Sequence, residues 1–296
     1  MSWLWAVFTV LAAGGQVLRN AQQKELTGTL GTVGATHVRF LFGLPFGLLF
    51  LAVVLLASAQ GLPPLNAPML AWSAAAALAQ ISATALLLAA MRDRSFVVTT
   101  AYTKTEPVQV AIFGLAFLGD RLSPGLALAI GIATAGVLIM SWPRSNAEEA
   151  FSWRPALLGI ASGAMFAIAA IGFRGGIRAL NADNFVLGAT STLAVGLIIQ
   201  TALLSIYLAL FDRAKLIAIC REWRPSMLAG FTGAFASQMW FLAFALESAA
   251  KVRTLALVEV LFAQILSRNL FKQRLASREA LGIFLIVAGV VLLLNL

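Results

Sequence analysis

The chain has few charges and little of the chemistry that metal centres and disulfides require. Only 11% of its 296 residues are charged, whereas 60% are hydrophobic, and an ordinary soluble domain has about 25% charged residues. The single cysteine, Cys220, excludes an internal disulfide and a cysteine-built metal site, and the single histidine, His37, argues against a histidine-built centre. We therefore expect no metal site and no cofactor.

Signatures of nucleotide hydrolysis and of serine hydrolases are also missing. The sequence has no Gly-Lys-Thr/Ser phosphate loop and no Gly-x-Ser-x-Gly elbow. The net charge of +9 comes from 21 lysines and arginines scattered near the ends of apolar segments, with no basic and aromatic run of the kind that binds nucleic acid. The sequence thus favours neither an enzyme nor a nucleic-acid partner.

Long apolar runs make up most of the chain and give it a mean hydropathy of +0.91. A water-soluble core of this size has no use for so much apolar surface, whereas a membrane-spanning helix needs about 20 apolar residues. Barrel strands need only about 10, so these runs predict an all-α membrane protein. We expect ten transmembrane helices, at about 3–22, 33–58, 68–91, 96–118, 123–142, 155–177, 184–210, 225–246, 250–271 and 277–296.

The sequence contains the same pattern twice, 153 residues apart. Positions 106–137 share ten identities with positions 259–290 without a gap, from Glu106 and Glu259 to Val137 and Val290, and Gly136 and Gly289 are among them. This duplication predicts two five-helix repeats, 1–142 and 155–296, joined by a polar linker at 143–154. Because five is odd, the second repeat should cross the membrane inverted relative to the first, an architecture that can open alternately to either side.

The densest polar stretch inside a predicted span is 99–109, which holds Lys104 and Glu106. A charge near the bilayer centre costs about 2.5–3.5 kcal/mol on insertion scales, so it should face protein or water and mark a path. Positions i and i+2 lie on different faces of a helix, so we expect these side chains to have different partners. Each either contributes to a substrate site or is neutralised by a neighbouring helix, Glu106 by Arg39 and Lys104 by Glu259.

Other polar and aromatic residues within the predicted spans complete the candidate site. Two opposed carboxylates would bind an amine or accept protons, and an arginine would bind a carboxylate. The ring faces of Tyr102 and Trp240 suit a flat or cationic ligand, whereas a lone histidine is as readily a packing residue. The candidate substrate-binding residues are His37, Arg39, Gln80, Thr84, Tyr102, Lys104, Glu106, Gln238, Trp240 and Glu259, and kinks are expected at Pro45 and Pro107.

Basic residues divide unequally between the two sides of this topology. Fourteen of them, Arg19 included, follow helices 1, 3, 5, 7 and 9, while five, Arg253 included, lie on the opposite side. The positive-inside rule places the richer side in the cytoplasm and both termini outside.

A family resemblance rests on several short motifs. The sequence Glu106-Pro107-Val108, followed by Gly119-Asp120-Arg121-Leu122-Ser123 and Ala135-Gly136-Val137, resembles the signature of EamA-type members of the drug/metabolite transporter superfamily. The stretch His37-Val38-Arg39-Phe40 is similar to the start of that family's second helix. In the second copy, Lys272-Gln273-Arg274-Leu275 replaces the core of the signature, and Val260 replaces its proline.

The resemblance implies ten helices in two inverted repeats and alternating access through a central cavity. It implies a small-molecule substrate and a multi-pass location in a bacterial-type inner (plasma) membrane. It also implies that both termini are cytoplasmic, which is the opposite of what the charge count predicts.

Besides a passive channel, three functions remain open on the sequence alone. The first is a secondary transporter that exports amino acids, aromatic ones included, with Glu106 and Glu259 for the amine and Arg39 or Lys104 for the carboxylate. The second is an exporter of lipophilic or aromatic cations, for which acids and aromatic rings would suffice. The third is a membrane-embedded enzyme on lipid-linked substrates, which the single histidine disfavours. Protons are the candidate coupling ion, since the two glutamates could accept them.

Overall fold

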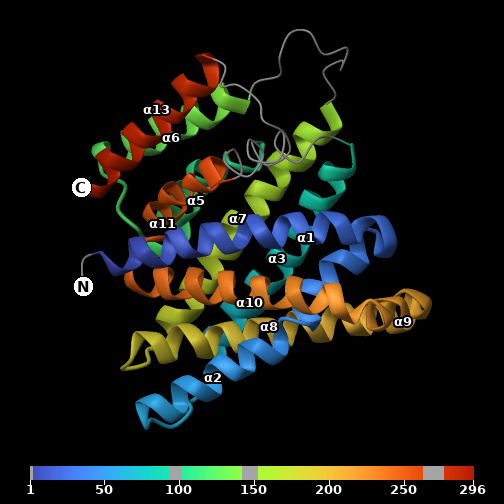
Figure 1. Ribbon diagram of the computed structural model, residues 1–296. Coiled ribbons are helices and arrows are strands. Elements are labelled where there is room, and N and C mark those ends of the chain that lie inside the picture. The colour runs from blue at the N-terminus through green and yellow to red at the C-terminus, as the bar shows by residue number, and fades with distance from the viewer. Residues whose placement is uncertain (1–2, 94–101, 142–152, 263–276) are drawn as a thin grey trace.

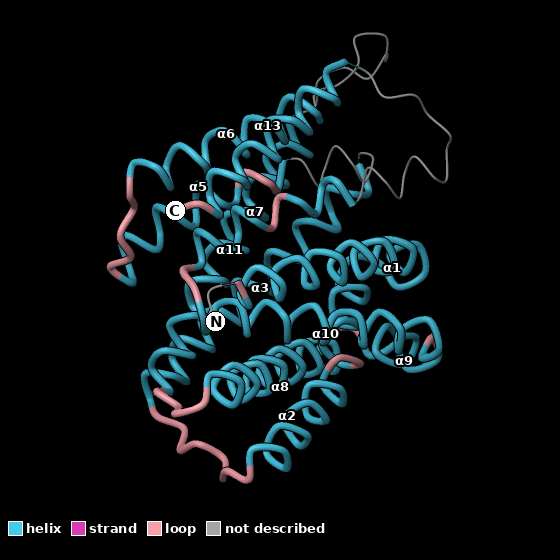
Figure 2. Tube along the Cα trace, turned by 60° about the vertical axis from the view of Figure 1, so that its left-hand side comes forward, coloured by secondary structure: helices cyan, strands magenta, loops and turns pink. Residues whose placement is uncertain are grey.

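The computed structural model describes residues 3–93, 102–141, 153–262 and 277–296, and within these ranges it contains helices and loops but no strand (Figure 2). Helices of the first half are α1 (Leu4–Leu41), α2 (Leu44–Ser58), α3 (Ala67–Asp93), α5 (Glu106–Phe113), the π-helix η1 (Gly114–Leu118) and α6 (Pro124–Ser141). Helices of the second half are α7 (Trp153–Leu180), α8 (Phe185–Phe211), α9 (Arg213–Arg221), α10 (Trp223–Leu246), α11 (Ala249–Leu255) and α13 (Ser277–Leu294). Both termini lie at the same end of the molecule (Figure 1).

Five helical segments are long and apolar enough to cross a membrane, namely Leu4–Ser58, Ala67–Arg92, Trp153–Leu180, Phe185–Phe211 and Trp223–Leu246. Within the first segment, α1 consists of two arms, 4–30 and 32–41, because the chain turns at Gly31. The φ of 67° and ψ of 178° at Gly31 form a conformation that glycine can adopt readily. α6 and α13 are shorter apolar helices at the predicted places. The predicted spans 96–118 and 250–271 lie partly outside the described residues, as does most of the predicted linker.

The predicted end of the first span at residue 22 is wrong. The helix continues through a polar stretch to Leu30, because the buried side chains of Leu26 and Leu30 keep one face of that stretch in the core. In addition, the Gln23 side-chain amide donates to the carbonyl of Ala35 on the second arm, 2.8 Å away, and so ties the two arms together. The extension places Arg19 in the middle of a helix rather than at its end.

The most extensive helix contacts join the first half of the chain to the second. α3 packs along α7, α1 along α10, and α6 along α13 (Figure 1). In the predicted repeats, α1 corresponds to α7 and α3 to α10, so the contact of α1 with α10 has the contact of α7 with α3 as its counterpart. Likewise α2 corresponds to α8 and α6 to α13, and each of these two pairs is itself in contact. The packing therefore follows a two-fold relation between the halves.

The crossing of α6 and α13 shows this relation at single residues. A Cβ on Gly136 would lie 2.7 Å from the Gly282 carbonyl oxygen and 2.8 Å from the Ile286 nitrogen. A Cβ on Gly289 would lie 2.9 Å from the Ala129 carbonyl oxygen and 2.8 Å from the nitrogen of Ala133. Each member of one contact lies 153 residues from its counterpart in the other, so the repeated glycines are the points where these two helices touch.

Two helix breaks precede the prolines singled out in the sequence. Turns at Phe42-Gly43 and Lys104-Thr105 interrupt the helical path, and Pro45 and Pro107 then lie in the first turns of α2 and α5. This position suits proline, which has no N–H to donate and a φ angle preset for a helix.

A third break has no proline. After α11 the chain turns at Ala256-Leu257, and the N–H groups of Leu257, Glu259 and Val260 donate to carbonyls only three residues back, at 2.9–3.1 Å. The breaks at 104–105 and 256–257 lie within one residue of equivalent positions in the two halves, so each half interrupts its helical path beside a buried glutamate, Glu106 or Glu259.

Candidate functional site

Six charged side chains from both halves form a buried group, here called the charged cluster, in which each side chain is between 1% and 5% exposed. Two come from the two arms of α1, two from the break at 104–105 and the start of α5, and two from α11 and the helical segment after the break at 256–257. In the same order they are Arg19 and Arg39, Lys104 and Glu106, and Arg253 and Glu259. The burial closes the cluster off from the surface in this conformation.

Lys104 and Glu259 form the first ion pair of the cluster, with the lysine Nζ 2.5 Å from Oε2 of the glutamate. The same carboxylate oxygen accepts a 2.8 Å hydrogen bond from Nε2 of Gln16, and the Oε1 of Gln16 accepts one from the indole Nε1 of Trp240 at 3.1 Å. A chain of contacts thus links both halves. Glu259 is occupied by partners from within the protein.

Glu106 and Arg253 form the second ion pair. The arginine Nε lies 3.0 Å from Oε1 of Glu106, although the N–H does not point along the line that a hydrogen bond requires. The guanidinium also lies over the Trp240 ring, 4.3 Å from its centroid, and 5.4 Å from that of Phe244. One face of Trp240, which the sequence offered to a ligand, is therefore covered by Arg253. The alternative pairing of Glu106 with Arg39 is wrong.

Arg39 and Arg19 have no acidic partner within 4 Å among the described residues. Arg39 donates to two hydroxyl oxygens, Thr84 Oγ1 at 3.1 Å and Ser237 Oγ at 3.4 Å. Arg19 donates from Nε and Nη2 to a single amide oxygen, Oδ1 of Asn20, at 3.2 and 2.7 Å. The two guanidinium groups are thus held by neutral acceptors alone.

The remaining candidates lie around the cluster rather than within it. The His37 Nε2 lies 3.0 Å from the Ser205 hydroxyl and faces α8. Gln80 accepts from Gln200 at 2.7 Å, which ties α3 to α8. Gln238 donates to Thr190 at 2.8 Å, and Tyr102 is half-buried with its carbonyl accepting from Thr105. Of the ten sequence candidates, Arg39, Thr84, Lys104, Glu106, Trp240 and Glu259 are brought together.

Sequence reasoning missed Arg19, Arg253 and Gln16. Both arginines were assigned to loops, and their burial corrects the count of basic residues outside the membrane to thirteen on one side and four on the other. The burial of Arg19 would have followed from a prediction that the helix continues through the polar stretch after it. The burial of Arg253 could have been inferred from its position only six residues before Glu259. Several other residues of that count, and the Arg274-Leu275 part of the repeat, lie outside the described residues.

The Asp120 carboxylate of the family-like motif lies at the end of the molecule that holds both termini. It accepts from Nη1 of Arg174 on α7 at 2.7 Å, and Arg178 lies 3.7 Å away. The Nε of Arg174 also donates to the Glu247 carbonyl at 3.1 Å. This contact joins the two halves at that end, away from the charged cluster.

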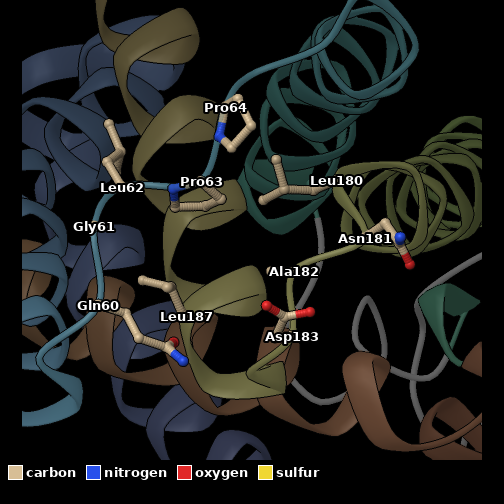
Figure 3. Close-up of a pocket in the computed structure, with 10 residues that line it drawn as sticks. All are labelled: Gln60, Gly61, Leu62, Pro63, Pro64, Leu180, Asn181, Ala182, Asp183 and Leu187. Atoms are coloured by element: carbon tan, nitrogen blue, oxygen red, sulfur yellow. The ribbon is translucent and has the colours of Figure 1, made fainter.

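A pocket of about 390 Å³ opens between the loop after α2 and the loop between α7 and α8 (Figure 3). Its lining contains Pro63, Pro64 and Leu180, with Asp183 as its charged side chain. No member of the charged cluster lines it, and its position at a helix end does not suit a central binding site. We therefore centre the candidate site on the charged cluster.

Comparisons with known proteins agree with the two-repeat fold. A model of the EamA-like transporter family matches residues 3–142 and 153–295. One solved crystal structure superimposes with a TM-score of 0.70 over 98% of this chain and 95% of the other, at 15% sequence identity. At that identity the likeness concerns the fold alone. No curated protein matches the chain.

Proposed function

Because the chain belongs to the EamA-like transporter family, we propose that it is a secondary transporter that exports small metabolites by alternating access through a central cavity. Amino acids, aromatic ones included, are the first class to test, because they carry the carboxylate that an arginine binds well. The proposed location is a bacterial-type inner (plasma) membrane. The family is one of transporters, so no enzymatic role is proposed.

The charged cluster is the observation that carries this proposal. Its six side chains lie where two interrupted helices, one from each half, meet the arms of α1. Secondary transporters with repeated halves bind substrates at such places, near the bilayer midplane and between discontinuous helices. Charges in this position are expensive in a membrane and are retained where they serve a path or a site.

In the proposed movement, helix pairs that join the two halves, such as α1 with α10 and α3 with α7, move as units, since their contacts are the most extensive. The breaks before Pro45 and Pro107, and the one at 256–257, are the proposed hinges, since interrupted hydrogen bonds let helix segments reorient. The contact of Asp120 with Arg174 would hold one end closed and would open when the cluster is exposed on that side.

The occupied carboxylates weigh against the export of lipophilic cations. Lys104 already neutralises Glu259, and Arg253 neutralises Glu106 while covering Trp240. A cationic substrate would have to displace an internal cation and would add to the positive charge of the cluster. For the same reason, proton coupling through either glutamate requires that its ion pair open during the transport cycle.

Counterflow in proteoliposomes tests the proposal. Vesicles loaded with an unlabelled amino acid or carboxylate should take up the labelled compound in a saturable manner. Lys104→Gln should reduce that uptake, whereas Arg213→Gln, an exposed position at the start of α9, should leave it unchanged. Flux that rises linearly with concentration, or that is equal in empty vesicles, would rule out a carrier.

A further inference from the structure

The charged cluster does not balance its own charges. It holds four cations and two carboxylates, and no other acidic side chain among the described residues is buried. Each carboxylate is paired with one cation, Glu259 with Lys104 and Glu106 with Arg253. Two positive charges are therefore in excess, and Arg19 and Arg39 are the two cations of the cluster without an ion pair among the described residues. Glu259 also attracts the charge of Arg19, but that carboxylate is already paired with Lys104.

Arg19 has an unused donor in the interior. The residue is 1% exposed, and its Nη1 has no hydrogen-bond partner. Its other two nitrogens share one acceptor, the Asn20 amide oxygen. Buried donors in native structures are nearly always satisfied, and an unsatisfied one points to a water, an ion or a ligand at that place.

Arg39 lies beside Arg19 on the same surface of α10. A Cβ on Gly233 would lie 3.2 Å from Arg39 Cγ and 3.4 Å from Arg19 Cδ, so both stems pack where that glycine has no side chain. Ser237, one turn further along α10, accepts from Arg39. Burial disfavours the charge of Arg39 most, and the charges of Arg19 and Arg253 repel it as well, so this arrangement is unfavourable without an anion.

We propose that Arg19 and Arg39 form an anion-binding site against Gly233, and that the transported substrate is a small organic dianion, a dicarboxylate or a phosphomonoester. Two negative charges would balance the cluster, and two oxygens of a carboxylate or of a phosphate can accept from the paired N–H groups of guanidinium. A zwitterionic amino acid would leave the two positive charges uncompensated, and its amine would find both glutamates occupied. This inference rests on the proposed transport function and, within it, favours organic dianions over the zwitterionic amino acids named first.

A second observation agrees with an anionic substrate. A cavity of about 290 Å³, lined by Thr32, Ala89, Arg92 and Arg154, lies where the two arms of α1 meet the end of α3 and the start of α7. Two arginines at its wall would raise the local concentration of anions there. The cavity lies on the side of the molecule that is rich in basic residues.

Ligand-induced thermal stabilisation of the purified protein tests the anion site, with succinate and glycerol 3-phosphate as dianions, tyrosine as a zwitterion, tetraethylammonium as a cation and sulfate as an inorganic dianion. A ligand that binds only the folded state raises its apparent stability with concentration. The two organic dianions should stabilise the protein more than the other three compounds, and the stronger of them identifies the anionic group.

Arginine variants separate a binding role from a structural one. Arg19→Gln and Arg39→Gln should weaken dianion binding roughly ten- to a hundredfold, since each removes charge-assisted hydrogen bonds. Without ligand they should melt at the same temperature as the parent or higher, because an uncompensated charge has been removed. Arg39→Lys should bind with intermediate affinity, and Arg213→Gln should bind like the parent. A lower melting temperature in both glutamine variants, with dianion binding unchanged, would overturn the proposal.

Counterflow with the same compounds distinguishes failure of this inference from failure of the transport function. Saturable exchange of tyrosine without stabilisation by any dianion would overturn the anion site and leave the transporter standing. Stabilisation by organic dianions without exchange of any solute would leave the site standing and overturn the transporter. If sulfate stabilises the protein at least as much as either organic dianion, the site binds inorganic anions, and the proposed substrate class is overturned.

Discussion

The ion pair between Lys104 and Glu259 should be strongly coupled. Replacing either residue by glutamine leaves the other charge buried, at 4% exposure for the lysine and 1% for the glutamate. Removing one partner of a buried pair costs about 3–5 kcal/mol. Glu259→Gln should lie at the upper end, because the only hydrogen-bond partner of Lys104 among the described residues is Glu259 and because the net charge of the cluster would rise from +2 to +3.

Lys104→Gln should lie nearer the lower end of that range. Glu259 keeps its hydrogen bond from Gln16, and the net charge of the cluster falls from +2 to +1. The double variant replaces the pair by two amides that can bond each other, so its cost should be about 1 kcal/mol or less. The two single costs together exceed the double cost by at least about 5 kcal/mol, which is the coupling energy expected from the double-mutant cycle in favour of the pair.

Reversible unfolding in mixed detergent micelles, with the four proteins in parallel, measures this cycle. The matched control is Lys251→Gln, which removes an ion pair to Glu247 at 3.6 Å, where the two side chains are 25% and 28% exposed. A pair of that exposure contributes about 0–1 kcal/mol. Additive effects of Lys104→Gln and Glu259→Gln, or a cost of Glu259→Gln no larger than the control, would refute the reasoning.

Three further predictions concern glycines, and a fourth concerns topology. Gly136→Ala places a methyl group against the α13 backbone and should cost about 1–3 kcal/mol in unfolding experiments, whereas Gly131→Ala, with open space around it in the same helix, should not destabilise. Gly31→Ala forces alanine to φ 67° and should cost about 1–3 kcal/mol, whereas Gly28→Ala, with nothing near it, should be neutral or stabilising. Gly233→Ala pushes on two flexible arginine stems, so dianion affinity in the thermal assay should fall while unliganded stability stays close to that of the parent. A reporter fused to the C terminus and active on one side of the membrane should report an external C terminus if the thirteen-to-four charge bias decides topology, and a cytoplasmic signal would refute that assignment.

The internal repeat of the sequence predicted more of the fold than the predicted helix boundaries did. The shared register of Gly136 and Gly289 locates the crossing of α6 and α13, because two copies of one pattern pack against each other in equivalent ways. The repeat also located Glu106 and Glu259, although it did not show that the helix breaks beside both. Pro107 indicates the first break, whereas the second copy has Val260 in place of that proline. The second break depends on hydrogen bonds to carbonyls three residues back, which no residue type in the sequence predicts.

The missed residues have a common cause. Arg19 follows an apolar run and precedes polar residues, which is the usual pattern of a helix end, and only the continuation of the helix to Leu30 places it in the interior. Arg253 lies two residues after Lys251 near the predicted start of a span, where an arginine ordinarily faces water. In both cases the depth of the side chain depends on neighbouring helices rather than on local composition.

The sequence by itself determined that this is a helical membrane protein with a duplicated unit and carboxylates at equivalent positions, because hydropathy and repetition are properties of order along the chain. Tertiary structure alone decided which charges cancel. Lys104 and Arg253 reach the two glutamates, while Arg19 and Arg39 meet only neutral acceptors. That outcome depends on distances between side chains from separate helices. A difference of a few ångströms decides whether a buried charge is compensated by a partner or remains available to a ligand.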